Sequence, residues 1–222
     1  MFDLEVWSKE NQIDKVKCVD IRTLTKKENR GYPNAILLLK ALPKQYLNQF
    51  EQGKAEDTIF HETEHQMDEL AEELAQKMIA EGYHAIAQSE KGLGDRGEFD
   101  FTTITSYLPH KKIATMSGIG WIGKNNLLVT KDFGCALCMC SVLTDMPLKT
   151  EESEIIMPKC GACNLCVTIC PAHVLHGKTW SKEVTRDEIV DVYHCQTCLQ
   201  CLVKCQYSIK YARSKENLTT YK

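Results

Sequence analysis

The chain lacks the features that would direct a protein into or through a membrane. Its 222 residues contain no apolar run of membrane-spanning length, and the first residues do not form the basic and then apolar pattern of a signal peptide. It also lacks an excess of positive charge, because 27 lysines and arginines face 30 aspartates and glutamates, for a formal net charge of -3. We therefore expect a cytoplasmic protein that binds no membrane and has no general attraction to nucleic acid.

Cysteine is scarce in the first part of the chain and abundant in the second. Residues 1–134 contain only Cys18, whereas the other eleven cysteines lie within residues 135–205. This contrast predicts two parts, an α/β domain over residues 1–150 and a metal-binding module over residues 151–222. Because no secretion signal is expected, the thiols should be reduced and bound to metal instead of joined in disulfides.

Most of the later cysteines form two runs with the same spacing, which we call the first and second combs. They are Cys160-x2-Cys163-x2-Cys166-x3-Cys170, followed by Pro171, and Cys195-x2-Cys198-x2-Cys201-x3-Cys205, without a proline. Two such runs are typical of bacterial-ferredoxin-like modules that hold two [4Fe–4S] clusters, in which the fourth cysteine of each run binds the other cluster. The expected ligand sets are Cys160, Cys163, Cys166 and Cys205 for one cluster and Cys195, Cys198, Cys201 and Cys170 for the other. Two zinc sites or a disulfide framework are weaker alternatives, because zinc sites more often use paired Cys-x2-Cys or mixed Cys/His spacing.

Four cysteines, Cys18, Cys135, Cys138 and Cys140, are not needed by the combs. The alternation of side chains along a strand would place Cys138 and Cys140 on one face. Two interpretations remain open for the three that lie close together in the sequence. They are either small buried hydrophobic residues, which is a common role of free cysteine, or a third metal or cluster site.

The first 150 residues show the mixed pattern of an α/β domain. Apolar residues at helical spacing predict a helix over Glu64–Glu81 that ends at Gly82. Its buried face should hold Met67, Leu70, Ala71, Leu74, Met78 and Ile79. Apolar runs predict strands over Val16–Leu24, Ala35–Leu42, Tyr83–Gln88, Asn126–Thr130 and Ala136–Thr144. Short helices are expected after each comb, and the polar tail from Ser214 is expected to fray.

Two glycine-rich segments imitate nucleotide-binding motifs. Gly92–Gly97 fits G-x-G-x-x-G, but Glu98–Tyr107 after it has the composition of a strand, whereas a dinucleotide site needs a helix there. We interpret Gly92–Gly97 as a loop between strands. Gly118–Lys124 nearly matches a phosphate-binding loop, yet Asn125 stands where a serine or threonine is needed. Its glycines either let the backbone approach a large flat ligand or form tight turns that pack Trp121 into the core.

Three segments, in this order, resemble the epoxyqueuosine reductase family. They are Leu108–Asn125, which contains Gly-Trp-Ile-Gly-Lys, then Val142–Leu148, which contains Leu-Thr-Asp, and then the two combs, so the resemblance extends to about Arg213. This family is similar to reductive dehalogenases. The resemblance implies a corrinoid-binding, nitroreductase-like α/β domain that receives electrons from the two-cluster module. It also implies a cofactor pocket bordered by Gly118, Gly120, Trp121, Gly123, Lys124 and Asn125.

The chain also departs from that family. Members carry an acidic proton donor where this chain has Ser106–Pro109, and they hold tRNA with a helical-repeat domain that we do not expect here. We therefore expect a cytosolic iron–sulfur oxidoreductase, supplied by a ferredoxin- or flavodoxin-type donor, that passes electrons to a cobalamin or directly to a small molecule or partner enzyme. Two alternatives remain open. One is a non-catalytic electron-transfer subunit, and the other is a protein that handles metals or clusters with Cys135, Cys138 and Cys140.

Overall fold

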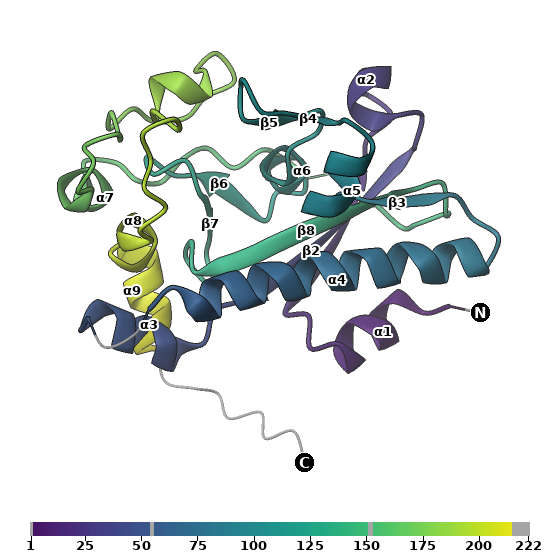
Figure 1. Cartoon of the computed structure of the whole chain (residues 1–222), viewed down its shortest axis with the longest axis horizontal. Coiled ribbons are helices and arrows are strands. Elements are labelled where there is room, and N and C mark those ends of the chain that lie inside the picture. Colours follow the sequence, from purple (N-terminus) through teal and green to yellow (C-terminus); the bar gives the residue numbers. More distant parts are fainter. Residues whose placement is uncertain (1, 54–55, 151–152, 215–222) are drawn as a thin grey trace.

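The computed structural model describes residues 2–53, 56–150 and 153–214, which form an antiparallel sheet covered by helices, with the cysteine-rich segments gathered at one end of it (Figure 1). The helices are Leu4–Glu10 (α1), Lys26–Asn29 (α2), Lys44–Glu51 (α3), Thr58–Ala80 (α4), Glu90–Asp95 (α5), His110–Met116 (α6), Leu165–Ile169 (α7), Gln200–Val203 (α8) and Gln206–Arg213 (α9), with a 3-10 turn at Arg186–Glu188 (η1). The strands are Lys15–Asp20 (β1), Asn34–Ala41 (β2), Ala85–Ala87 (β3), Phe99–Asp100 (β4), Thr105–Ser106 (β5), Gly120–Ile122 (β6), Leu128–Thr130 (β7) and Leu137–Thr144 (β8). The mixed α/β content predicted from the sequence is confirmed.

The central sheet has the strand order β1-β2-β8-β3, and each neighbouring pair is antiparallel. Two small hairpins, β4-β5 and β6-β7, lie outside it. The long pair at its centre is in register over eight residues, with Ile36 opposite Val142 and Leu38 opposite Cys140. Figure 1 shows α4 lying along β8, so the longest helix and the central strands form two layers.

Apolar side chains on both faces of β2 explain why this strand lies at the centre of the fold. Ile36 and Leu38 belong to the core under α4, whereas Leu37 and Leu39 belong to a second core under α6. All four are fully buried. Full burial of one such side chain is worth roughly 1.5–3 kcal/mol, so the alternation fixes the register as well as the position of the strand.

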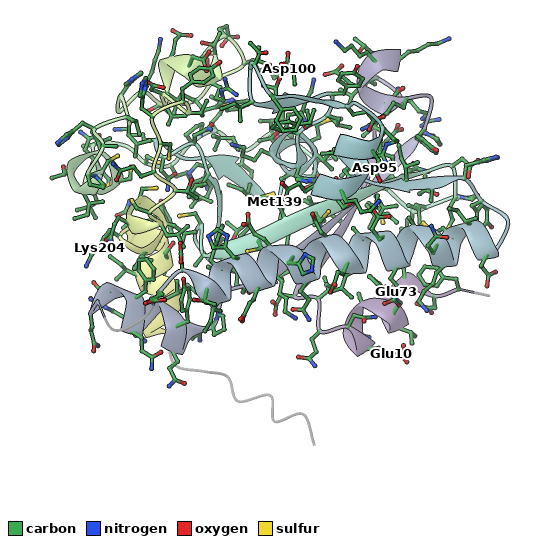
Figure 2. The ribbon with its side chains drawn as sticks, viewed as in Figure 1. Glu10, Glu73, Asp95, Asp100, Met139 and Lys204 are labelled. Carbon is green, nitrogen blue, oxygen red and sulfur yellow. The ribbon has the colours of Figure 1, made fainter. Side chains whose placement is uncertain are left out.

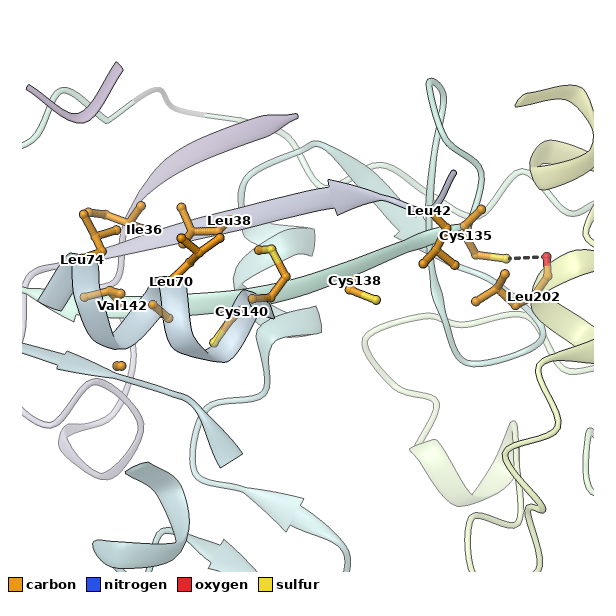
Figure 3. Packing of buried hydrophobic residues seen from close by; sticks show 14 of the residues in the cluster. Ile36, Leu38, Leu42, Leu70, Leu74, Cys135, Cys138, Cys140, Val142 and Leu202 are labelled. Carbon is orange, nitrogen blue, oxygen red and sulfur yellow. Dashed lines mark hydrogen bonds between the residues drawn. The ribbon is translucent and has the colours of Figure 1, made fainter. Parts of the chain in front are cut away.

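The predicted helix is present but begins earlier than expected, because α4 starts at Thr58. Leu70 and Leu74 pack onto the sheet as predicted (Figure 3). Ile79 was wrongly assigned to the buried face, since it is 45% exposed. It follows Met78 by one residue and is therefore rotated by about 100° around the helix axis, away from the sheet. The helix ends at Ala80, and Gly82, the predicted stop, follows the C-cap residue Glu81 with a φ of +92°.

The segment after β3 differs from the prediction in two ways. Gly92–Gly97 is not a loop, because α5 covers most of it, and the Ser89 hydroxyl accepts a hydrogen bond from the Gly92 N–H as an N-cap. Glu98–Tyr107 is not one strand, because Asp100 accepts hydrogen bonds from two backbone N–H groups of the following residues and so bends the chain into the β4-β5 hairpin. Local side-chain caps therefore override the strand-like composition.

The cysteine-rich segments contain little regular structure. The short helices α7 and α8 lie inside the combs, α9 follows the second comb, and the helix predicted after the first comb is present only as the 3-10 helix η1. Leu199, Leu202 and Val203 pack into the same core as α4, so this part of the chain is fixed against the sheet. The predicted fraying tail lies outside the described residues beyond Ser214. Within the described ranges, no helix is both long enough and apolar enough to cross a bilayer.

Candidate functional site

The eight comb cysteines line two cavities, with four cysteines in each. The small cavity, which Lys124, Asn125 and Tyr207 also line, has in its wall Cys160, Cys163, Cys166 and Cys205. The large cavity, of about 570 Å³, has in its wall Cys170, Cys195, Cys198 and Cys201. Each group combines three cysteines of one comb with the last cysteine of the other comb. Crossed ligation of two clusters requires this grouping.

The backbone of each comb is bent tightly between its first cysteines. In the first comb Gly161 has a φ of +51°, and the Cys163 N–H donates to the Cys160 carbonyl at 3.0 Å before α7 begins. In the second comb Thr197 and Leu199 have φ values of 51° and 57°, and α8 follows directly. A left-handed backbone conformation is costly for residues with a side chain, such as Thr197 and Leu199. It persists only where the surrounding structure enforces it, which is common at functional sites.

The buried comb thiols resist ionisation unless positive charge is brought to them. Burial, followed by the charge of neighbouring comb cysteines, raises the pKa of Cys166 to about 11. The same causes raise the pKa of Cys201 to about 12. Metal ligation requires the thiolate form and releases these protons. Both groups therefore suit a cationic occupant that can accept several thiolates at once.

The donor sets fit iron–sulfur clusters better than the two alternatives. None of the twelve cysteines, all of which lie in the described ranges, is joined in a disulfide. A cubane takes one thiolate on each of its four irons, so each group of four cysteines supplies the ligands that one cluster needs. Zinc sites more often use paired Cys-x2-Cys or mixed Cys/His spacing.

Cys205 differs from the other comb cysteines in the number of donors around its sulfur. It precedes α9, and hydrogen bonds from the Cys135 thiol, from the backbone N–H groups of Tyr207 and Ser208 and from the Ser208 hydroxyl lower the pKa of Cys205. Cys135 in turn accepts from Asn125 Nδ2 at 3.4 Å and lies 3.3 Å from Ser208 Oγ. These contacts prepare the Cys205 sulfur to carry negative charge.

The three cysteines for which the sequence left a third metal site open lie in β8 (Cys138 and Cys140) and in the turn just before it (Cys135). Figure 3 shows each of them beside a different neighbour. Cys135 Sγ lies 3.5 Å from the Leu202 carbonyl, Cys138 lies against Phe60, and Cys140 is buried under α4. All three are buried in the core, as the alternative role of small buried residues requires.

Most of the glycine loop Gly118–Lys124, the expected cofactor border, lies outside the walls of the two cysteine-lined cavities. Of the six candidates, only Asn125 lines the large cavity, and only Lys124 and Asn125 line the small one. A Cβ at Gly120 would lie 2.3 Å from the Val129 carbonyl, so glycine permits the close β6-β7 hairpin.

The same loop fastens the first comb to the α/β part. Trp121 is buried edge-on against Tyr207, with ring centroids 4.9 Å apart. The Lys124 ammonium donates to the Gly161 carbonyl and to Asn164 Oδ1, both at 2.9 Å. The indole N–H of Trp121 is buried without a partner in the described residues. The loop thus supports the small cavity. The unpartnered indole N–H belongs to Trp121, whose ring packs against Tyr207 in the wall of that cavity.

Besides its cysteines, the large cavity is lined by four titratable or charged side chains, Glu64, His110, Lys111 and Arg186. Burial lowers the pKa of His110 to about 4, and burial together with Arg186 lowers the pKa of Lys111 to about 8. Burial also raises the pKa of Glu64, a half-exposed carboxyl at the cavity rim. Ser106 lines the same wall, so a carboxylic acid reaches this cavity from α4 and not from the segment around Ser106. Glu64 was missed because its sequence context indicates a solvated helix face.

A buried polar network holds His110 on the cavity wall. His110 Nδ1 and Gln88 Nε2 both meet Ser141 Oγ, at 2.8 Å and 2.6 Å respectively. The Gln88 side chain also accepts from Arg30, whose guanidinium forms an ion pair with Glu98. These residues come from five separate segments of the first 150 residues, so the folded sheet, and no local motif, creates this wall.

Comparison with known proteins identifies relatives by sequence. No protein-family model matches the chain. It is 33% identical over 103 residues to an epoxyqueuosine reductase of Lactococcus garvieae, a match that covers 46% of the chain and 26% of the relative. It is 32% identical over 107 residues to an epoxyqueuosine reductase of Pseudomonas aeruginosa, covering 45% and 29%. The chain thus matches under a third of these curated relatives. The resemblance predicted from the sequence motifs is confirmed.

Solved structures show the same fold at lower identity. A catabolic reductive dehalogenase superposes with a TM-score of 0.70 at 15% identity, over 94% of this chain and 32% of that one. A second dehalogenase structure, whose title concerns B12-dependent dehalogenation, gives 0.60 at 16% identity, over 77% and 24%. The epoxyqueuosine reductase of Streptococcus thermophilus gives 0.53 at 16% identity, over 92% and 65%. The chain therefore has the α/β fold found in both groups of reductases.

Proposed function

We propose that this chain is the electron-transfer core of an iron–sulfur reductase, in which two [4Fe–4S] clusters deliver electrons to an acceptor in the large cavity. The first cluster would be bound by Cys160, Cys163, Cys166 and Cys205. The second cluster would be bound by Cys170, Cys195, Cys198 and Cys201. The observation that carries the proposal is that the second group of cysteines forms part of the wall of the 570 Å³ cavity. An acceptor bound there would lie directly beside the second cluster.

The cavity favours a reductase over a simple electron carrier. A volume of about 570 Å³ is within the usual range of small-molecule sites, roughly 300–1,000 Å³. A carrier needs no such space beside its cluster. The alternative of metal or cluster handling is less favoured, because Cys135, Cys138 and Cys140 have different neighbours in and just before β8.

A corrinoid is the acceptor that we propose for the large cavity. Support comes from the shared fold with a dehalogenase whose title concerns B12-dependent dehalogenation. The cavity combines apolar walls, such as Leu128 and Val174, with the polar groups of Glu64, Lys111 and Arg186, which suits a flat ring with amide arms. A bound corrinoid would supply a cobalt centre that can be reduced one electron at a time.

The residues of the chain would orient the substrate and supply protons beside that acceptor. Glu64 and Lys111 are the candidates, because their surroundings shift both pKa values toward neutrality. His110 stays neutral above about pH 4 and is fixed by Ser141, so it would serve as a hydrogen-bonding group. Ser106 lines the cavity without offering an acid, which supports a substrate different from that of the named relatives.

Electrons would enter through the first cluster from a ferredoxin- or flavodoxin-type donor in the cytoplasm. The exposed apolar residues Met157, Leu165 and Ile169 lie in and beside the first comb, where such a partner could dock. The second cluster would then pass each electron to the cavity. Asn125 lines both cavities and donates to the Cys201 carbonyl at 3.2 Å, so it would lie between the two clusters.

Anaerobic purification with iron analysis tests this proposal directly. We expect about eight irons per chain, because two cubanes of four irons are proposed. A solvent extract of the protein, or of the protein incubated with cobalamin, should contain a corrinoid with its visible spectrum. Iron near twelve per chain would revive a third cluster, and a protein without acid-labile sulfide would contradict the proposal.

Removing the Cys135 thiol should make the first cluster harder to reduce. Hydrogen bonds to ligating sulfurs stabilise the more negative, reduced state. The one S–H of Cys135, which donates to the Leu202 carbonyl in this structure, would turn to Cys205 once that sulfur is a thiolate ligand. In Cys135→Ala we expect the midpoint potential of one cluster to fall by tens of millivolts, given that a tenfold change in a one-electron equilibrium corresponds to about 59 mV. Redox titration followed by electron paramagnetic resonance measures this shift.

Cys138→Ala is the matched control, since it removes a nearby buried thiol whose sulfur donates to the Phe60 carbonyl. Both potentials should remain unchanged in this variant. Equal shifts in the two variants, or none in Cys135→Ala, would show that the hydrogen bond does not act on the cluster.

A further inference from the structure

A second cavity, of about 440 Å³, adjoins the large one and is lined by cations. Its wall contains Lys111, Lys112, Lys182 and Arg186, together with the ring of Trp180, and none of the described residues along it is acidic. Lys111 and Arg186 also line the large cavity, so the two cavities share a wall. We call this second space the basic cavity.

The positive charge of the basic cavity is only partly neutralised by the protein. Lys112 is paired with Glu28, and Arg186 lies 2.8 Å from Asp187 while donating to two backbone carbonyls. The Lys111 ammonium donates to the Asn126 carbonyl at 2.8 Å, a neutral acceptor. A partly buried ammonium beside an arginine is costly without a counter-charge, and Lys111 retains further N–H groups for an anion.

We infer that the basic cavity binds a phosphate ester whose organic part contacts Trp180 or extends into the large cavity. Phosphate is favoured over a single carboxylate because it carries about -1.5 to -2 charges at neutral pH and three acceptor oxygens, which suits several cations at once. Trp180 offers a half-buried aromatic surface beside them. The inference deepens the proposed function, because it assigns an anionic group to the ligand or substrate of that same reductase.

Calorimetric titration of the cluster-loaded protein with phenyl phosphate, phenol and inorganic phosphate tests the inference without any turnover. We expect phenyl phosphate to bind more tightly than either of the others. Lys111→Met should weaken phenyl phosphate at least tenfold, and Lys182→Gln, a change at an exposed side chain, should weaken it by a smaller factor. Lys9→Met, on the exposed side of α1, is the matched control and should bind as the original protein does.

The outcomes separate this inference from the proposed function. Absence of phenyl phosphate binding, or equal binding by Lys111→Met and Lys9→Met, would overturn the basic cavity as a phosphate site even if both clusters are present. Binding of phenyl phosphate by a protein that shows no reductase activity would support the phosphate site and contradict the proposed function.

Corrinoids then identify which molecule carries the phosphate. If it belongs to the cofactor, cobalamin should compete with phenyl phosphate and lose affinity in Lys111→Met, whereas cobinamide, which lacks the nucleotide phosphate, should do neither. If it belongs to the substrate, phenyl phosphate should bind together with either corrinoid. Both results support a phosphate site, whereas competition by cobinamide as strong as that by cobalamin would contradict it.

Discussion

Cys170→Ala should remove the cluster otherwise bound by the second comb, although Cys170 belongs to the first. Cys170 lines the large cavity with Cys195, Cys198 and Cys201, and its charge contributes to the raised pKa of Cys201. A cubane that loses one of four thiolates is expected to degrade or lose iron. Iron should therefore fall from about eight toward about four per chain, while the spectrum of the first cluster remains.

Electron paramagnetic resonance and Mössbauer spectroscopy of the reduced variant distinguish the two clusters. Cys138→Ala is a suitable control, because Cys138 also lines the large cavity but is assigned no metal. It should keep about eight irons by the same count. Damage confined to the cluster of Cys160, Cys163 and Cys166 would show that the ligation is not crossed. Reductase activity should vanish in Cys170→Ala, since the proposed electron path ends at the second cluster.

The parts of this molecule that could be predicted from sequence are those set by short-range spacing. Neighbouring comb cysteines are separated by only two or three residues and must lie near one another whatever the rest of the fold does, so most of each ligand set could be proposed at once. Strand β2 was equally accessible, because Ala35–Leu39 is apolar on both faces and only a central strand buries both. The resemblance to epoxyqueuosine reductases also depended on contiguous motifs.

The parts that could not be predicted depend on contacts between distant segments. Glu64 looks like a solvated residue in sequence, and only the placement of α4 beside the second comb brings it to the cavity. The glycines of Gly118–Lys124 suggested a ligand, yet the close neighbour of Gly120 is the backbone of Val129 in its own hairpin. A glycine in a sequence indicates that another group approaches the backbone closely. It does not indicate whether that group belongs to a ligand or to the protein itself.

The pairing of Arg30 with Glu98 is another long-range contact, and removing it should have the largest effect on stability. The two side chains are 12% and 10% exposed, and Arg96 Nε donates to the same carboxylate at 2.9 Å. Burial lowers the pKa of Arg30 and Glu98 raises it, so the carboxylate maintains its charge. Glu98→Ala would leave two partly buried guanidiniums without it, and we expect a loss of about 3–5 kcal/mol in the free energy of unfolding.

Urea denaturation of the anaerobic protein measures this loss, and Asp95→Ala provides the control. Asp95 pairs with Lys91 on the exposed surface of the neighbouring helix α5, so its removal should leave the urea midpoint almost unchanged. Because Arg30 also contacts Gln88, and Gln88 shares Ser141 with His110, Glu98→Ala should disturb the cavity wall as well as the fold. A urea midpoint of Glu98→Ala as high as that of Asp95→Ala would mean that the charges of Arg30 and Arg96 are neutralised by other groups. It would also mean that His110 is held without this network.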